Sequence, residues 1–442
     1  MAVQDFFYEK FIIRSADGST EVDAALGQFR VISFSYYENI LSPFIDGKIL
    51  ISSTSNVLES TTDTQNRSGS IYTGLPLEIG CEIFVKIKDS MGEGLNFSSK
   101  KDEYQRLYVN EVQVIDKSST SETIQIRFIS KIGWLNNTKR ITKHYSGSIS
   151  SSVEKIIKDE LKFSKVDVTP TSNTYSFAGM SKRPFDLIAM LAKQSMPANQ
   201  ANPGYFAFET KSGFKFSSID SLINSIPYSD TYYYNGSNES TYYAKDNRTN
   251  FKVQSLNILK DQNLINQIRS GVYGIKTVIF NPAAYTFTEI NHTVDNNKLI
   301  KDPKFSKLGG DIDVPKIIDD DLKFGNKNHR IETAILNVGA ETLKNNPNNN
   351  PMKYIAEASA RYNVLFSQKH NIQVPVNTNL EAGDTINLLV EYIGDSKEQG
   401  PDQKQSGKYI IQALCHEFQP ERTTTSLSLI RDSYGLHSSK SN

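Results

Sequence analysis

A turn between two runs with the character of β-strands is predicted in the stretch Val374-Pro375-Val376-Asn377-Thr378-Asn379-Leu380-Glu381-Ala382-Gly383-Asp384-Thr385-Ile386. These runs cover 370–376 and 384–390, and further strands are predicted at 409–414 and 423–430. Ala382-Gly383-Asp384 is expected to reverse the chain, because glycine readily adopts the positive φ that tight turns require. The C-terminal part of the chain is therefore predicted to be rich in antiparallel β-structure.

The N-terminal stretch, to about Ile132, alternates in the same way. Apolar residues at every second position, bounded by Gly, Asp and Ser, predict strands with one buried face at 29–36, 46–52, 82–88, 107–112 and 122–128. No helical pattern intervenes, so an antiparallel sandwich or barrel is expected. Ser55–Tyr72 is rich in Ser, Thr and Asn and is predicted to be a long loop.

The pattern changes from period two to a helical period in the middle of the chain. Apolar residues fall on one helical face in 150–163 and again in 184–196, where Pro184 can occupy the first turn. Tyr205–Glu209 and Phe214–Phe216 then predict a β-hairpin around Lys211-Ser212-Gly213. This middle region is predicted to be α+β.

The remaining segments return to strands with two helices among them. Strands are predicted at 251–256 and 273–279, a short helix at 263–268, an amphipathic helix at 352–366, and a polar loop excursion at 298–329. The predicted fold is mainly β: two antiparallel β-barrel domains, at 1–132 and 231–433, with a smaller α+β domain inserted at 133–230. Residues 434–442 are predicted to form a disordered tail.

Composition narrows the function classes. Lys+Arg and Asp+Glu both number 49, so the formal net charge is zero, which argues against a general nucleic-acid binder. Cys81 and Cys415 are far apart and are predicted to be small buried hydrophobes, as expected for synthesis in a reducing compartment. Neither a signal peptide nor an apolar run of bilayer-spanning length is evident.

No motif in the sequence predicts a catalytic, cofactor-binding or metal-binding residue. The acidic group Asp311, Asp313, Asp319, Asp320 and Asp321 lacks the ligand order of a calcium loop and is predicted to be solvated. His416-Glu417-Phe418-Gln419-Pro420 resembles the start of a zinc-protease helix, but position 420 is proline and the segment lies between strands. A nucleophile elbow and a phosphate loop are also absent, although a carboxylate pair formed only in the fold stays open.

Tyrosines cluster at Tyr232-Tyr233-Tyr234 and Tyr242-Tyr243, on either side of Asn235-Gly236-Ser237-Asn238. Exposed tyrosines can stack on sugars or bases, or anchor a protein interface. Strands around a glycine-containing turn explain the same pattern without any ligand. The structural or interface interpretation is favoured.

Three stretches resemble the baseplate hub family of T-even-type contractile phage tails. They are 176–188 with 204–216, then Val374–Ile386, and then 406–411 with 423–433. The first resembles the helix that precedes an aromatic hairpin in hub proteins, and the other two resemble the closing strands of the second hub barrel. Their order and spread cover most of the chain, although 55–72 and 298–329 are not matched.

The resemblance implies a structural virion protein of the tail baseplate, not an enzyme, with no cofactor. It implies a homotrimer in which each subunit contributes two barrels similar to the tail tube, so that three subunits form a pseudo-six-fold ring around the DNA channel. Such a ring joins the hexameric tube, or its initiator ring, to a trimeric spike with an OB-type domain, and it contacts baseplate wedge or surrounding hub proteins. The same module occurs in type VI secretion spike proteins. DNA is expected only to pass through a lumen without continuous basic stripes, stable membrane insertion is not expected, and assembly is expected in the host cytoplasm.

Two other functions stay open at this point. Abundant Tyr, Ser, Thr and Asn also suit a receptor-binding or carbohydrate-binding virion protein, but the mixed α+β middle is unlike a fibre. A spike-associated cell-wall hydrolase would need a catalytic constellation, such as a cleft that holds a carboxylate with a raised pKa.

Overall fold

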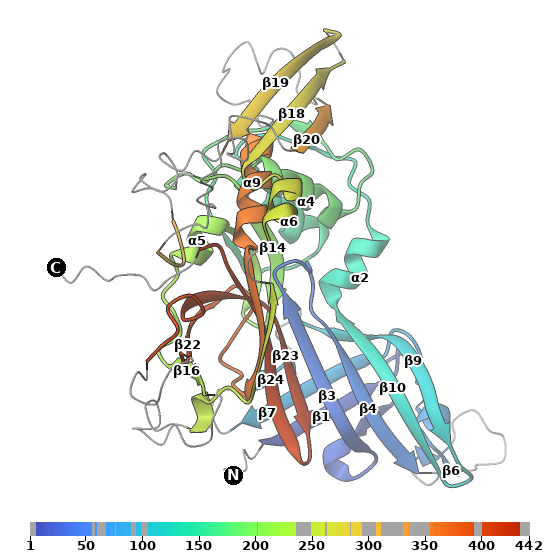
Figure 1. The fold of residues 1–442 in the computed structure, drawn as a ribbon. Helices are drawn as coiled ribbons and strands as arrows, with labels where there is room; N and C mark the ends of the chain where they lie inside the picture. The colour runs from blue at the N-terminus through green and yellow to red at the C-terminus, as the bar shows by residue number, and fades with distance from the viewer. Residues whose placement is uncertain are drawn as a thin grey trace.

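The computed structural model describes residues 6–54, 58–59, 68–75, 77–89, 94–98, 105–200, 202–235, 249–260, 263–282, 284–293, 306–310, 330–335, 354–392 and 400–433. Figure 1 shows two β-rich halves at one end, helices and small sheets above them, and a projecting sheet at the opposite end. Most of the acidic excursion, Tyr242-Tyr243 and the tail 434–442 lie outside the described residues, as does most of 55–72. None of the described helices is long and apolar enough to cross a membrane.

The first β-rich half contains all five strands predicted for it. Its strands are β1 (Phe6–Arg14), β2 (Glu21–Asp23), β3 (Arg30–Asn39), β4 (Asp46–Thr54), β7 (Glu82–Asp89), β8 (Leu95–Asn96), β9 (Leu107–Lys117) and β10 (Ser121–Ser130). Neighbours pair in the order β3-β4-β10-β9-β7-β1-β2, with β8 on β7. Short elements accompany them: η1 (Ala24–Leu26), β5 (Leu58–Glu59), β6 (Ser68–Gly69) and α1 (Ile71–Gly74). β1 was not predicted, because a bulge between Tyr8 and Lys10 interrupts its period-two pattern.

The second β-rich half is formed mainly by the C-terminal strands that were predicted. It contains β16 (Thr231–Tyr234), β17 (Ser255–Lys260), β21 (Gln368–Pro375), β22 (Thr385–Val390), β23 (Gly407–Gln419) and β24 (Arg422–Arg431). The predicted strand at 251–256 is wrong: the 3-10 helix η4 (Thr249–Phe251) comes first, and β17 begins four residues later. Gly383 has φ +87°, which confirms the predicted turn, and an isolated bridge between Tyr233 and Lys252 connects β16 to the segment just before β17.

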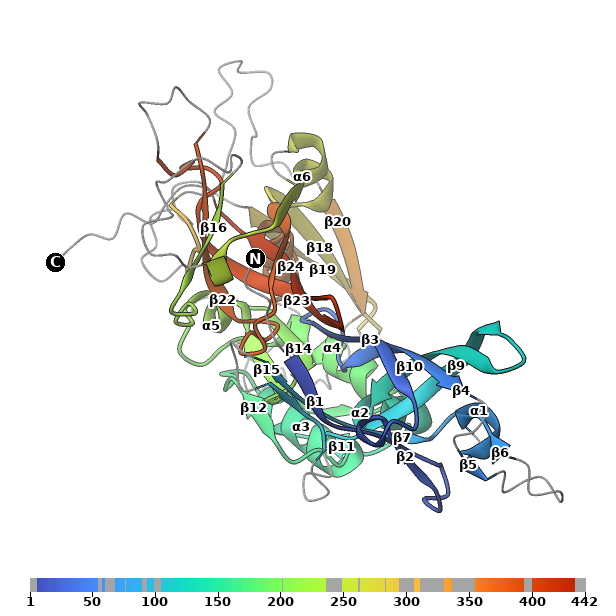
Figure 2. The same cartoon turned by 90° about the horizontal axis from the view of Figure 1, so that it is seen from below.

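One strand pair joins the two halves into a single sheet. β23 pairs antiparallel with β3, from Ala413 opposite Asn39 to Phe418 opposite Phe34. Figure 2 shows the halves lying on either side of this pair. Apolar residues of both halves form one continuous core, in which Phe34 contacts Phe11, Phe128 and Phe418. Burial of this shared apolar surface stabilises the halves as one body.

The α+β middle region packs above the sheet with its own core. It contains α2 (Lys131–Thr138), β11 (His144–Tyr145), α3 (Ile149–Lys155), the π-helix η2 (Ile156–Glu160), β12 (Val166–Val168), β13 (Phe177–Ala178), α4 (Pro184–Gln194), β14 (Tyr205–Thr210), β15 (Gly213–Ser218) and α5 (Ile219–Ile223). The predicted hairpin is confirmed as β14–β15, and the predicted helix at 150–163 continues through a π-helical turn. Pro184 starts α4 as expected.

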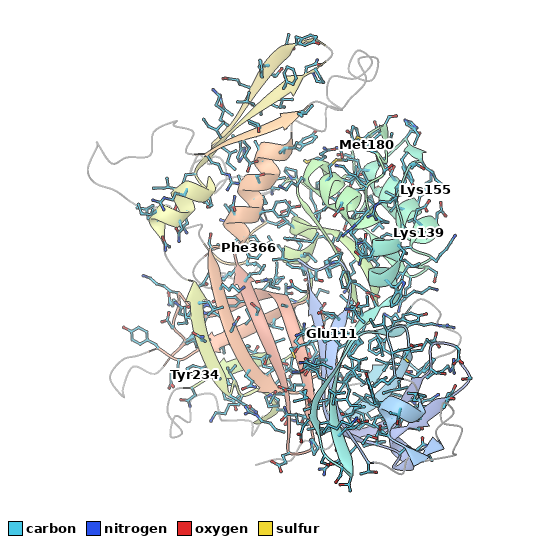
Figure 3. All side chains as sticks on the ribbon, turned by 90° about the vertical axis from the view of Figure 1, so that its right-hand side faces the viewer. Glu111, Lys139, Lys155, Met180, Tyr234 and Phe366 are labelled. Atoms are coloured by element: carbon cyan, nitrogen blue, oxygen red, sulfur yellow. The ribbon has the colours of Figure 1, made fainter. Side chains whose placement is uncertain are left out.

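A three-stranded sheet projects from the far end. It consists of β19 (Thr286–Thr293), β18 (Gly274–Asn281) and β20 (Arg330–Ile335), in that order. Two helices lie beside it, α6 (Leu264–Ser270) and α9 (Ile355–Leu365), and α9 stands between this sheet and the second β half (Figure 1). Phe366 follows α9 at its lower end, as Figure 3 shows. β19 and β20 were not predicted.

Candidate functional site: the junction of the three units

Two of the residues that the sequence singled out, His416 and Tyr232, are linked only indirectly, through buried hydrogen bonds of Thr425 and Asn377. His416 is a fully buried residue of β23, where its ring stacks on Tyr36 with centroids 6.2 Å apart. Burial lowers the pKa of His416 to about 3. The hydroxyl of Tyr232, which is buried in β16, accepts a hydrogen bond from the Asn377 side chain at 3.0 Å. Among the described residues, no group of three or more His, Cys, Asp or Glu side chains could hold a metal ion.

The structure instead gathers buried carboxylates where the three units meet. Glu38 of β3 is 2% exposed and accepts three hydrogen bonds. The Tyr36 hydroxyl donates at 2.7 Å, the backbone N–H of Lys211 at 2.7 Å, and the backbone N–H of Ala382 at 2.8 Å. Lys211 belongs to the β14–β15 turn and Ala382 to the turn before β22. One carboxylate therefore ties the first β half, the α+β unit and the second β half together.

The Glu381–Asp384 turn contributes two more acids to this junction. Glu381 forms an ion pair with Lys215 at 2.9 Å and accepts a hydrogen bond from the Ser212 hydroxyl. Burial opposes ionisation of Glu381, but Lys215, Ser212 and Lys211 together lower its pKa. Burial raises the pKa of Asp384 to about 6, against the effect of Lys215. Burial, together with repulsion from Glu381, raises the pKa of Glu38 to about 7. Glu38 and Glu381 therefore titrate as a pair: Glu381 ionises readily, and Glu38 beside it resists ionisation.

Glu209, at the end of β14, fastens the same hairpin to the first β half. Its Oε2 accepts hydrogen bonds from the backbone N–H of Ile45 at 2.9 Å and from the Ser130 hydroxyl at 2.5 Å. Its Oε1 is buried without a hydrogen-bond partner among the described residues. Burial raises the pKa of Glu209 to about 8, although the two donors favour the ionised form. The folded protein therefore holds this carboxyl protonated at neutral pH.

We expect Glu209 to make stability depend on pH. Its pKa is about 8 in the folded protein and 4.5 ordinarily, so the folded state binds more protons between these values and stability falls as pH rises through this window. The limiting slope for one group is about 1.4 kcal/mol per pH unit. Glu209→Gln cannot titrate and should flatten the pH dependence of urea unfolding, most clearly between pH 7 and pH 8, which lies above the Glu38 pKa of about 7, so that Glu38 contributes less of the slope there. Glu154→Gln, on the surface of α3, is the matched control and should keep the pH dependence of the wild type. If Glu209→Gln also keeps it, burial of Glu209 is not the source of the pH dependence.

A second buried polar group joins α9 to the α+β unit and to the end of β24. The Arg361 guanidinium pairs with Asp432 at 3.0 Å and with Asp220 at 3.4 Å. It also donates to the carbonyl of Ser306 at 2.6 Å. The Arg361 side chain is 3% exposed and both carboxylates are fully buried. Burial raises the pKa of Asp220, against the effect of Arg361.

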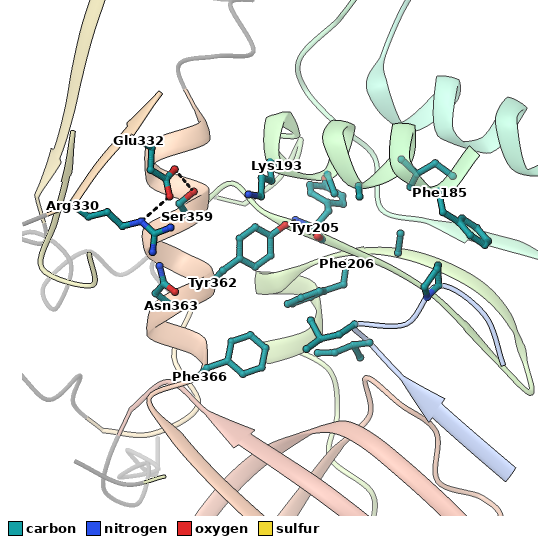
Figure 4. A pocket seen from close by; sticks show the side chains of 17 residues that line it. Phe185, Lys193, Tyr205, Phe206, Arg330, Glu332, Ser359, Tyr362, Asn363 and Phe366 are labelled. Carbon is teal, nitrogen blue, oxygen red and sulfur yellow. Dashed lines mark hydrogen bonds and ion pairs between the residues drawn. The ribbon is translucent and has the colours of Figure 1, made fainter. Parts of the chain in front are cut away.

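A cleft of about 400 Å³ opens between α4, β14 and α9 (Figure 4). Tyr362 and Phe366 form part of its apolar wall. On its rim Arg330 pairs with Glu332 at 3.1 Å, and the Ser359 hydroxyl donates to Glu332 at 3.0 Å. Arg330 and Glu332 thus neutralise each other, Lys193 adds a positive charge to the lining, and the cleft separates elements of different units.

Sequence reasoning missed the junction residues, although one signal was present. Phe34, Tyr36 and Glu38 occupy alternate positions of one strand, so a carboxylate lies on the same face as two buried aromatics. An acid at a core-facing position predicts a polar contact in the fold. Its donors, the backbone N–H groups of Lys211 and Ala382, could not be inferred because they come from distant turns.

Comparisons with known proteins show that the chain is similar to a phage baseplate hub protein in sequence and to tail proteins in fold. No family model matches the chain. In sequence it is 21% identical over 323 residues to the probable baseplate hub protein gp334 of Vibrio phage KVP40, covering 71% of this chain and 73% of that protein. In structure it is similar to the tail protein from Neisseria meningitidis MC58, with a TM-score of 0.53, 10% identity and 96% of both chains covered. It is equally similar to the 43 kDa tail protein of prophage MuSo2 from Shewanella oneidensis, with a TM-score of 0.53, 10% identity, and 96% and 99% covered. The chain therefore has the fold of phage tail proteins, and the resemblance to baseplate hub proteins that its sequence indicated is confirmed.

Proposed function

We propose that this chain is a structural subunit of a phage baseplate hub, located in the virion, and that it is not an enzyme. The observation that carries the proposal is the β3–β23 pair, which makes one sheet from two β-rich halves. The sequence similarity to a baseplate hub protein and the fold similarity to tail proteins support it. Three such subunits would present six β-rich halves and so match a six-fold tube on one side and a trimeric spike on the other.

The free edges of the shared sheet support ring formation. Among the described residues, β7 covers β9 only at Leu107 and Tyr108 and the edge of β9 beyond them has no strand partner; Ile115 there is 54% exposed. At the other end, β17 pairs with β21 on one side, and Ile258 and Leu259 are exposed. Unpaired edges with exposed apolar residues are prone to pair with another chain. We propose that β9 of one subunit pairs with β17 of the next.

The face of this sheet that points away from the core suits a channel wall. Near the β3–β23 pair it carries Ser35, Cys415, Ser426 and Ser428, with Glu417 and Lys48 on either side of Ser35. Its charges are mixed in sign, since Arg127 lies 3.6 Å from Glu111. We propose that this face surrounds the DNA channel, because mixed charge allows a polyanion to pass without being held.

We also propose that the chain is divided into two tube-like domains at 1–132 and 231–433, an α+β insertion at 133–230 and a disordered tail at 434–442. We propose contacts with the tube or its initiator ring, the OB-type domain of the spike, and surrounding baseplate proteins. We further propose that these assemble in the host cytoplasm.

Mass measurement in solution, with and without the spike protein, tests the proposal. A trimer, either alone or with the spike, is expected. A chain that stays monomeric and binds no spike would contradict the hub proposal. Hydrolysis of peptidoglycan by the purified chain would contradict it as well.

Ile115→Lys is expected to weaken the trimer by placing a charge on the open edge of β9, which would disfavour pairing of strands there. The matched control is Ile226→Lys, since Ile226 is 92% exposed and lies outside the sheet. Sedimentation at several concentrations should show the trimer dissociating at higher concentration for Ile115→Lys than for Ile226→Lys. Circular dichroism should show both variants folded, and equal dissociation of the two would argue against β9 as an interface.

A further inference from the structure

Across the part of the chain that the structure describes, the first β half is not closed into the barrel that the sequence predicts. Among the described residues no strand ladder joins β1 to β3, and a slot of about 780 Å³ lies between them. Phe6 and Tyr8 line it from β1, and Phe29 and Val31 line it from the start of β3. The β1–β3 slot is therefore an apolar opening into the core of this half.

Both walls of the β1–β3 slot are strand edges that the described residues leave unpaired. β1 pairs with β7 along one side, but on its other side β2 covers only Ile12–Arg14, so Phe6–Phe11 lack a strand partner and Phe6–Tyr8 of these line the slot. β3 pairs with β4 on one side, and β23 covers only Phe34–Asn39 on the other, which leaves Arg30–Ser33 open. Unpaired backbone N–H and C=O groups on facing edges can bind a strand placed between them.

The side chains around the slot define what this strand must carry. Phe29 is 5% exposed and Val31 is 8% exposed, so the inner wall is apolar, and Ala24 and Ala25 leave room at one end. Arg30 is exposed and is the only charged side chain among the described residues that line the slot. The slot thus combines backbone edges, an apolar floor and one cation.

We propose that the β1–β3 slot accepts an extended segment of a partner protein, with alternating apolar side chains and an acidic side chain that meets Arg30. The inserted strand completes the first β half by pairing with β1 and β3. This inference goes beyond the proposed ring, because the edges of β9 and β17 lie elsewhere in the sheet. It concerns a single copy of the chain and can fail or hold independently of trimer formation.

The test uses the full chain and a fluorescent peptide of about eight residues, long enough to span the open edges. The peptide alternates valine and threonine and has one central glutamate. A second peptide carries lysine in place of the glutamate, and a third has alternate backbone nitrogens methylated so that it cannot pair. We expect saturable binding of the first peptide, roughly tenfold weaker binding of the lysine peptide, and no binding of the methylated one.

Two variants and one control locate the site. Ala25→Trp fills the slot from an exposed position and should abolish binding, and Arg30→Glu should reverse the preference between the glutamate and lysine peptides. Arg140→Glu, an exposed charge reversal in the α+β unit, should bind like the wild type. Hydrogen exchange should show added protection of Phe6–Tyr8 when the glutamate peptide is bound and no change with the methylated peptide.

Three outcomes would overturn the proposal. The first is the absence of saturable binding to the wild-type chain. The second is equal binding by the wild type, Ala25→Trp and Arg30→Glu. The third is loss of self-association in Arg30→Glu, which would assign the slot to a contact between copies of this chain.

Discussion

Replacing Arg361 by methionine is expected to lower the free energy of unfolding by about 3–5 kcal/mol, the usual cost of breaking a buried ion pair from one side. The methionine leaves Asp220 and Asp432 buried without their shared cation. Burial already raises the pKa of Asp220 against the effect of Arg361, so removing the arginine should raise that pKa further. The deficit should therefore shrink at acidic pH, where a neutral carboxyl costs less to bury. Urea unfolding over a range of pH would measure it.

Arg330→Met is the matched control for this prediction. Arg330 is 43% exposed and pairs with Glu332, so its replacement should cost at most about 1 kcal/mol. A combined Arg361→Met, Asp220→Asn and Asp432→Asn variant should recover much of the lost stability, because no buried charge is left unpaired. If Arg361→Met unfolds no more easily than Arg330→Met, the buried network does not hold α9 to the rest of the chain.

Replacing Phe34 by alanine is expected to destabilise the protein by about 3–5 kcal/mol, because it opens a cavity in the shared core. Phe34 is fully buried and stacks on Phe128 with centroids 5.6 Å apart. It also contacts Phe418 at 6.2 Å, across the β3–β23 pair. Removing it should therefore loosen both halves together, and hydrogen exchange should increase in β3 and β23 alike.

Phe287→Ala provides the control for the effect of losing a phenyl ring. Phe287 lies in β19 and is 70% exposed, so its replacement should change stability by no more than about 0.5 kcal/mol. If Phe34→Ala increases exchange only in β3, the two halves do not share one cooperative core.

Local patterns were enough to predict those elements whose partners are near in sequence. The β14–β15 hairpin has its turn and both strands within 205–218, and the Gly383 turn follows from glycine alone. β20 illustrates the opposite case, because it pairs in parallel with β18, which lies some fifty residues earlier in the sequence. Its alternation is also weak, because four of its six side chains are exposed, and they lie on both faces of a small sheet. The period of a short edge strand does not reveal its partner.

The candidate site was harder to predict than the fold for a related reason. Glu38 stands on a core-facing position of its strand, but its donors come from turns near residues 211 and 382. Such a junction exists only once three units have packed together. The aromatic and glycine patterns indicated the hub resemblance, whereas the buried acids that hold the units could be found only in the folded chain.

The pairing of β3 with β23 also has a consequence for biosynthesis. β3 leaves the ribosome early, but Phe418, which lies opposite Phe34, is near the end of the chain. Because translation proceeds at about 5–20 residues per second, the edge of β3 stays unpaired for tens of seconds before β23 has been synthesised. During that time an apolar strand edge is open to neighbouring nascent chains. We expect truncated products that lack β23 to aggregate or to be retained by chaperones, so that only completed subunits enter assembly.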